Sequence, residues 1–202
     1  MIPRARALRA VVLFSGLVAA ASGQSGGSLG RSTLTVAGIG GPDFLSPPDV
    51  STQVVMPMVE AGRFVFSRLE VGLALAPGIF IRQSIRADGL GERETATAFA
   101  AGVYLRLYPA PYSWRIRPYL EISEEPFYAD RPVPAGGSRF NFLSQGGAGF
   151  STALSWLEPW SLVVGYRFVH VSNAQLYHPN PGSTFNGIVL GLRKYTAAGG
   201  AR

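Results

Sequence analysis

The sequence predicts an all-β protein, an eight-stranded antiparallel transmembrane β-barrel of the outer-membrane type. Three observations support this fold class. The 202-residue chain begins with an export signal, the remainder has few charges and no apolar segment of helix length, and that remainder is a series of short alternating segments. No repeat or domain boundary interrupts the series, so we expect a single barrel domain over residues 24–202.

Residues 1–23 have the parts of a secretory signal peptide. Arg4, Arg6 and Arg9 precede a short apolar run, and small residues at 21–23 suit cleavage. Removing this segment takes away three of the 18 basic residues and none of the 12 acidic ones, so the net charge falls from +6 to +3. The rest of the chain has no basic run, which argues against a nucleic-acid partner.

The composition of the chain is typical of a membrane barrel. There is no cysteine, so no disulfide framework can hold an exported chain of this kind together. Charged residues make up 15% of the chain, against about 25% in an average soluble protein. The mature chain also lacks a run of the ~18 apolar residues that a membrane helix needs. Strands are therefore the elements expected to cross a membrane.

Short alternating segments separated by Gly, Pro, Asp and Ser predict the strands in order. The eight expected ranges are 31–39, 53–62, 66–84, 93–108, 115–128, 139–156, 160–174 and 185–195. Eight strands close into the smallest common membrane barrel, whose interior is filled by side chains. Glu124 and Glu125 adjoin a proline, and we expect them at a strand end in solvent.

Each strand has one large apolar face and one face of small or charged residues. In the strand 160–174, one face carries Trp160, Leu162, Val164, Tyr166 and Phe168, and the other carries Ser161, Val163, Gly165, Arg167 and Val169. A soluble lipocalin-like barrel would turn the apolar face inward and show a varied Lys/Glu surface. Because the chain has a single lysine, Lys194, we interpret the apolar faces as lipid-facing.

The smaller faces also carry single charges of both signs, which need partners inside a narrow lumen. These charges are Glu70, Glu121, Arg106, Arg117 and Arg167, and we expect them to pair. The tryptophans Trp114, Trp156 and Trp160, together with the tyrosines, fit aromatic girdles at the membrane interfaces.

Both histidines lie in the stretch GYRFVHVSNAQLYHPNPG, residues 165–182. His170 and Ser172 are two residues apart, which is the period of a β-strand, so their side chains should leave the same, lipid-facing side. A serine hydroxyl becomes a nucleophile when a base takes its proton, and histidine is the usual base. An H-x-S pair also recurs by chance, so a purely interfacial role stays open. His178 lies in a proline-rich turn and is expected at the surface.

The residues around this pair make the pattern more specific. YRFVHVSNA at 166–174, followed by PNPG at 179–182, resembles the lipid A 3-O-deacylase (PagL) family of outer-membrane enzymes. The resemblance implies a barrel that hydrolyses an ester-linked acyl chain of lipid A, at the 3-O position, without a cofactor. It implies the following residue roles: His170 as general base, Ser172 as nucleophile, Asn173 and the backbone of Gln175 in the oxyanion hole, and Ala174, Asn180 and Gly182 as parts of the motif and its turn.

Two positions depart from the family pattern. The family glutamate fourteen residues after the histidine, which orients and charges the imidazole, is Thr184 here, and the family glycine after the serine is Gln175. Thr184 and Asn186 share the lipid side of the last strand and could lie near His170. We predict Asn186 as the third catalytic residue, because an asparagine can orient a histidine. Its interpretation as an ordinary polar residue at a strand start stays open.

The sequence therefore predicts a carboxylic ester hydrolase in the bacterial outer membrane. Its expected partners are lipid A or lipopolysaccharide as substrate and the surrounding membrane lipids. Two histidines and no cysteine predict no metal site. A barrel of the same family that has lost catalysis and keeps a lipid-binding or structural role is one alternative, and an unrelated porin-like barrel is another. A glycerophospholipid substrate and a homodimer are both left open.

Overall fold

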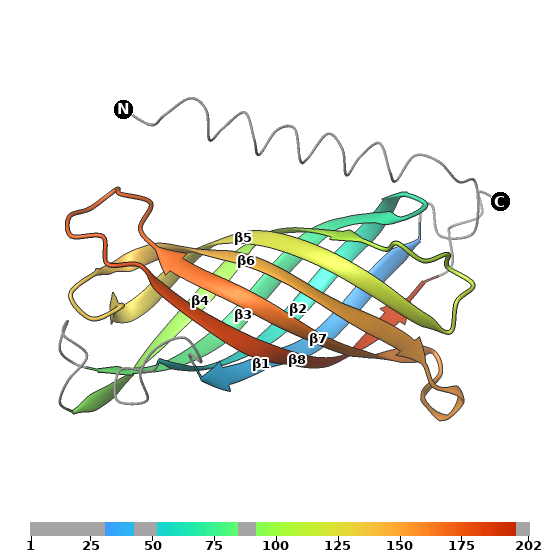
Figure 1. Ribbon diagram of the computed structural model, residues 1–202, viewed down its shortest axis with the longest axis horizontal. Helices are drawn as coiled ribbons and strands as arrows, with labels where there is room; N and C mark the ends of the chain where they lie inside the picture. The colour runs from blue at the N-terminus through green and yellow to red at the C-terminus, as the bar shows by residue number, and fades with distance from the viewer. Residues whose placement is uncertain (1–30, 43–51, 85–91, 197–202) are drawn as a thin grey trace.

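The computed structural model describes residues 31–42, 52–84 and 92–196 as a closed antiparallel barrel (Figure 1). Its strands are β1 (Ser32–Pro42), β2 (Gln53–Phe66), β3 (Leu69–Ser84), β4 (Arg93–Leu107), β5 (Ile116–Val133), β6 (Ser138–Ala153), β7 (Trp160–Ser172) and β8 (Ser183–Tyr195). Each strand pairs with its neighbour in the sequence, and β8 pairs with β1. Because the barrel is closed, β1 and β8 leave no unpaired strand edge. The predicted fold class is confirmed.

The predicted strands correspond one to one to β1–β8, with ends that differ by a few residues. The largest difference is β5, which runs past its predicted end at 128 to Val133. Glu124 and Glu125 therefore lie within a strand, and the prediction that they end one was wrong. Pairing of β5 with β4 skips Glu125 and Pro126 and resumes in the same register, so the barrel accommodates a residue without an N–H.

Only one short helix occurs in the described ranges, the 3-10 turn η1 (Ser155–Leu157) between β6 and β7. No helix there is long and apolar enough to cross a membrane. The predicted signal peptide at 1–23 lies outside the described residues.

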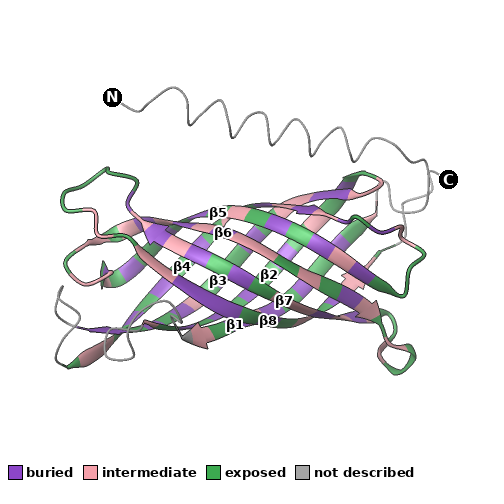
Figure 2. Cartoon of the chain, in the orientation of Figure 1, coloured by how far each residue is buried: buried purple, intermediate pink, exposed green. Residues whose placement is uncertain are grey.

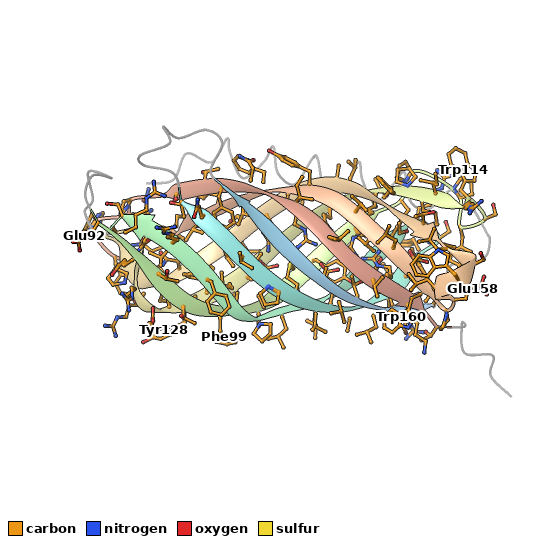
Figure 3. The ribbon with its side chains drawn as sticks, turned by 90° about the horizontal axis from the view of Figure 1, so that it is seen from below. Glu92, Phe99, Trp114, Tyr128, Glu158 and Trp160 are labelled. Atoms are coloured by element: carbon orange, nitrogen blue, oxygen red, sulfur yellow. The ribbon has the colours of Figure 1, made fainter. Side chains whose placement is uncertain are left out.

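Because the number of strands is even, the start of β1 and the end of β8 lie at the same end of the barrel. At this end, Ser32 and Thr196 are joined by a backbone hydrogen bond of 2.9 Å, and we call this the terminal end. It also carries the connections 67–68, 108–115 and 154–159. The opposite end, which we call the loop end, carries the connections 43–52, 85–92, 134–137 and 173–182. Trp114, Glu158 and Trp160 mark the terminal end in Figure 3, and Glu92 marks the loop end.

Buried and exposed residues alternate along the strands, as Figure 2 shows. In β4, Phe99 and Val103 are about half exposed, whereas Ala100, Tyr104 and Arg106 are buried. The side chains that point outward are thus the large apolar ones, and those that point inward are small, aromatic or charged. This is the reverse of a soluble barrel and is typical of a barrel surrounded by lipid.

The lumen is crossed by a network of buried ion pairs. Arg106 and Arg167 each bind both Glu60 and Glu121, with Arg106 Nη2 2.8 Å from Glu60 Oε2 and Arg167 Nη2 2.6 Å from Glu60 Oε1. Arg193 joins them through Glu60 at 3.4 Å. These charges compensate one another in a space that excludes most solvent, which is what buried charges require.

A carboxylate of β3, Glu70, anchors the part of the network nearer the terminal end. It accepts hydrogen bonds from Thr33 Oγ1 at 2.5 Å, Tyr104 Oη at 2.5 Å and Tyr108 Oη at 2.8 Å. Arg193 Nη1 lies 3.5 Å from its Oε2. Among the charges expected to pair, Arg117 is the exception, because aromatic rings surround it and no described carboxylate forms an ion pair with it.

Candidate active site

The predicted pair lies on the outer surface of β7, close to the loop end. His170 and Ser172 are both partly buried, and they alternate with Val169 and Val171, which are buried in the barrel. On the same outward face, Phe168 is 44% exposed. The pair therefore shares the apolar face that the sequence assigned to lipid.

The imidazole is oriented by a residue of the neighbouring strand. His170 is the direct partner of Thr184 in the β7–β8 ladder, and His170 Nδ1 lies 3.1 Å from Thr184 Oγ1. With its proton on Nδ1, the ring donates to the threonine oxygen, and Nε2 keeps its lone pair for a substrate or nucleophile. Thr184 thus makes the contact that the family glutamate would make, without supplying its negative charge.

Gly182 provides the space into which this ring projects. A Cβ atom on Gly182 would lie 2.9 Å from His170 Cε1 and 3.4 Å from Nε2. The residue after it, Ser183, pairs with Val171, so Gly182 is beside the segment where Ser172 stands. The Cε1 edge of the imidazole, with Nε2 next to it, is therefore directed toward Gly182. This contact gives a physical reason for a glycine in the turn.

The loop between β7 and β8 is held closed by two asparagines. Asn180 Oδ1 accepts the backbone N–H of Asn173 at 3.0 Å, and Asn173 Nδ2 donates to Tyr177 O at 3.1 Å and Pro179 O at 3.3 Å. Asn173 is 1% exposed, so this bonding is internal. The network fixes the backbone that follows Ser172.

Two consecutive residues of this loop have left-handed backbone conformations. Ala174 has φ 52° and Gln175 has φ 66°. Glycine reaches this region without steric cost, whereas a side chain adds roughly 1–2 kcal/mol. The family glycine at position 175 is thereby explained, and the glutamine here carries strain.

The same hydrogen bonds decide which donors of the loop are available. Gln175 N donates to Asn173 Oδ1 at 2.9 Å, and the amide of Asn173 is used by the loop carbonyls. In this conformation both predicted oxyanion donors hold the loop. The N–H of Ala174, between them, has no acceptor within the described part of the chain.

Asn186, predicted as the third catalytic residue, lies one outward position further along β8. It pairs with Phe168 and is 3% exposed. The hydrogen bond recorded for the imidazole goes to Thr184 instead. Glu121 lies in the lumen, bound to Arg106 and Arg167, on the other side of the wall.

Cross-strand pairing adds two polar residues that the sequence analysis missed. His170 pairs with Ser144 of β6, and Ser144 pairs with Glu124 of β5, so an outward row runs from Thr184 through His170 and Ser144 to Glu124. The alternation of Leu120 and Ile122 already indicated that Glu124 faces outward. Its closeness to His170 depends on register, which the sequence does not supply.

A hollow of about 580 Å³ on the barrel wall adjoins this row. Ser144 and Glu124 line it together with the outward-facing Val103, Leu105 and Ile122. It is mostly apolar, so it suits a hydrocarbon chain. Among the described residues no cluster of three or more metal-ligating side chains occurs.

Solved structures share the barrel fold. OprG from Pseudomonas aeruginosa matches at 12% identity and TM-score 0.53, over 85% of this chain and 98% of that one. Neisserial surface protein A matches at 16% identity and TM-score 0.53, over 84% and 99%. The outer membrane enzyme PagL matches at 18% identity and TM-score 0.52, over 80% and 98%. Identities this low show the fold alone.

Comparison with curated proteins finds no match. The family model of lipid A 3-O-deacylase (PagL) matches residues 80–193, which is more than half of the chain and includes all of β4–β7, the loop 173–182 and most of β8. The resemblance seen in residues 165–182 is confirmed by this match. The chain therefore belongs to the lipid A 3-O-deacylase (PagL) family of bacterial outer-membrane proteins.

Proposed function

We propose that this protein removes an ester-linked acyl chain from lipid A, with His170 as general base and Ser172 as nucleophile. The observation that carries the proposal is the imidazole held by Thr184 on the lipid-facing surface, two residues from a serine on the same face. A membrane lipid can reach such a site without leaving the bilayer. A water-soluble ester would have to enter it.

The reaction follows the chemistry of a serine hydrolase. His170 Nε2 takes the proton of Ser172 Oγ while Oγ attacks the ester carbonyl, and the ring then returns that proton to the departing sugar oxygen. The acyl group is left on Ser172. A water molecule, deprotonated by the same ring, releases the fatty acid and restores the serine. The Ala174 N–H supports the oxyanion in our proposal, and Asn173 and Gln175 hold its loop in place.

The position of the site along the barrel agrees with a lipid A substrate. In outer-membrane barrels the longer loops are extracellular, and here the longest connections, 43–52 and 173–182, are at the loop end. The pair would then lie in the outer leaflet, where lipid A is found. The apolar hollow beside Ser144 supports a place for an acyl chain.

The missing family glutamate sets the expected rate. Thr184 holds the ring of His170 in place but adds no charge to stabilise an imidazolium. In our proposal the reaction proceeds more slowly than with a glutamate. The strand register also brings a carboxylate toward the site, that of the outward-facing Glu124, which pairs with Ser144, the partner of His170. An ionisable residue facing lipid is costly and usually functional, which supports a part for Glu124 in the proposed site. Asn186 remains a proposed third residue with weaker geometric support.

Mass spectrometry of lipid A tests the proposal. Cells that express the protein should show lipid A lacking one hydroxyacyl group, and cells with the Ser172→Ala variant at equal outer-membrane abundance should not. Isolated glycerophospholipids supplied to the purified enzyme distinguish the two lipid substrates. Unchanged lipid A and unchanged phospholipid in both strains would contradict the proposal.

A second candidate is a family member that binds lipid without cleaving it, and the threonine at 184 is the observation that favours it. Thr184→Glu discriminates the two: activity that appears only in this variant identifies a lost site. A solute channel is disfavoured, because the ion pairs of Glu60 with Arg106 and Arg167 cross the lumen.

A further inference from the structure

The terminal end of the barrel contains a cavity of about 380 Å³, at the opposite end from the proposed active site. Its lining residues come from the β4–β5 connection and from β5, β6, β7 and β8: Tyr112, Ser113, Trp114, Arg115, Arg117, Ser151, Ala153, Ser161 and Tyr195. Two of them are arginines, five carry hydroxyl groups, and none is acidic. The cavity is therefore cationic and rich in hydrogen-bond donors.

Arg117 is buried in the wall of this cavity and is 5% exposed. Its Nε, Nη1 and Nη2 have no hydrogen-bond partner among the residues that the structure describes. Its Cζ lies 4.4 Å from the centroid of the Tyr108 ring and 4.6 Å from that of Tyr112, with the rings of Phe64 and Tyr195 beyond 5 Å. The rings attract the cation through their faces, but they leave its N–H groups without acceptors.

The other buried arginines of the lumen show what Arg117 lacks. Arg106, Arg167 and Arg193 each contact at least two carboxylate side chains. The carboxylates of Glu60 and Glu121 are bound by those arginines, and Glu70 is held by three hydroxyl groups together with Arg106 and Arg193. A buried charge without a counter-charge is strongly disfavoured. Arg117 is therefore built to receive its acceptors from outside the described chain.

We propose that this cavity binds a phosphate group, with Arg117 as its central ligand. A guanidinium offers several N–H donors in a fixed plane and matches the oxygens of a phosphate. Arg115 adds a second positive charge. The hydroxyls of Ser113 and Ser161 line the same cavity and can donate to the remaining oxygens, and Ser151 Oγ lies 3.1 Å from Tyr195 Oη, so this pair can supply one further donor. A phosphate group offers more acceptor oxygens than a carboxylate does, so it can use more of these donors at once.

The phosphate can belong to dissolved phosphate or to a phospholipid headgroup of the membrane leaflet at the terminal end. Dissolved phosphate presents four terminal oxygens and a phosphodiester headgroup presents two, and either can accept hydrogen bonds from the guanidinium group of Arg117. Trp114, which is 58% exposed, lines the cavity at that end, so either source can reach it. The experiment below separates them, and it does not depend on ester hydrolysis.

Tryptophan fluorescence of the folded barrel provides the readout, because all three tryptophans of the chain are at this end. Replacing Trp156 and Trp160 by phenylalanine leaves Trp114, which lines the cavity, as the sole reporter. The protein in a phosphate-free detergent is titrated with inorganic phosphate at constant ionic strength, with chloride as the control anion. We expect a saturable change with phosphate and none with chloride.

Variants of Arg117 connect the response to the proposed ligand. Arg117→Met should abolish the response, and Arg117→Lys, which keeps the charge but loses the planar donor fork, should weaken binding about tenfold or more. Arg131→Met at the loop end, which removes a partly exposed arginine paired with Glu94, is the matched control and should leave the response unchanged. If Arg117→Met does not fold, Arg117→Lys and Ser161→Ala serve as the test.

The same titration in nanodiscs separates the sources. A response to phosphatidylglycerol discs over phosphatidylcholine discs after removal of free phosphate, together with no response to inorganic phosphate, assigns the site to an anionic headgroup. A response to inorganic phosphate assigns it to dissolved phosphate or a phosphorylated solute. No response to either, or an equal response in the folded Arg117→Lys variant, overturns the proposal.

Discussion

The inner and outer faces of the barrel use polar residues in opposite ways. Inside, Glu60 and Glu121 are bound by guanidinium groups at distances below 3 Å, so the charges compensate one another and the side chains are held in place. Outside, His170 contacts a neutral threonine, and the carboxylate in its row, Glu124, has no ion pair among the described residues. Successive residues of the same strands thus form a structural ion-pair network on one side and the proposed active site on the other.

Replacing the imidazole is expected to give the largest effect, on activity alone. His170→Gln removes the base but keeps a polar side chain of similar size at an outward position. Hydrolysis of lipid A should fall by at least about 10³-fold, because in the proposed mechanism the serine hydroxyl loses the group that takes its proton. The free energy of unfolding in urea should change little. A folded variant that retains more than a tenth of the activity would show that His170 is not the base.

Breaking the inner network is expected to affect stability alone. Glu60→Gln keeps the shape of the side chain but removes the charge shared by Arg106, Arg167 and Arg193, which leaves positive charges uncompensated. We expect a loss of about 3–5 kcal/mol in the free energy of unfolding. Equilibrium unfolding in urea, followed by tryptophan fluorescence in lipid vesicles, measures it.

The activity of this variant is the second half of the test. Assayed at a temperature where it remains folded, Glu60→Gln should hydrolyse lipid A at close to the unmodified rate. A large loss of hydrolysis with unchanged stability would mean that the two faces are coupled, and the contrast between them would fail.

The sequence predicted this division because a strand has a period of two. Alternation alone placed Phe168, His170 and Ser172 on one face and Arg167 on the other, with no knowledge of neighbouring strands. It could not supply the partners across the lumen. Glu60 and Arg193 entered the ion-pair network only through barrel closure, and Arg117 proved to lack the carboxylate partner expected for it.

The sequence also could not supply the register between neighbouring strands. The sequence left both Thr184 and Asn186 as candidates near His170, and a difference of one outward position between them depends on how β7 aligns with β8. The loop 173–182 sets this alignment through the bonds of Asn173 and Asn180, which have no periodic signal. Glu124 was misplaced for a related reason, since Pro126, two residues further on, suggested a strand end where β5 continues.

Restoring the family carboxylate would sharpen the comparison by adding charge on the outer face. Thr184→Glu places an anion opposite His170 Nδ1, where a hydrogen bond to a charged group replaces one to a neutral hydroxyl. The difference is about 1–1.5 kcal/mol, which corresponds to a rise of about tenfold in kcat/KM. Thr184→Gln, with an uncharged side chain of the same length, is the control. If kcat/KM rises equally in both variants, the length of the side chain at position 184, and not its charge, limits the native site.

The smallest expected effect concerns the loop that carries the proposed oxyanion donor. Gln175 has φ 66°, so Gln175→Gly should relieve a steric penalty while its N–H keeps the hydrogen bond to Asn173 Oδ1. The gain in the free energy of unfolding should be about 1 kcal/mol, reduced by the greater freedom of glycine in the unfolded chain. Arg139→Gly in β6, at a position with no positive φ, should destabilise the barrel instead. If hydrolysis also rises in Gln175→Gly, strain at this position displaces the Ala174 N–H from its best geometry. If stability rises and hydrolysis does not, the loop already holds that donor correctly, and the missing charge at position 184 alone limits the rate.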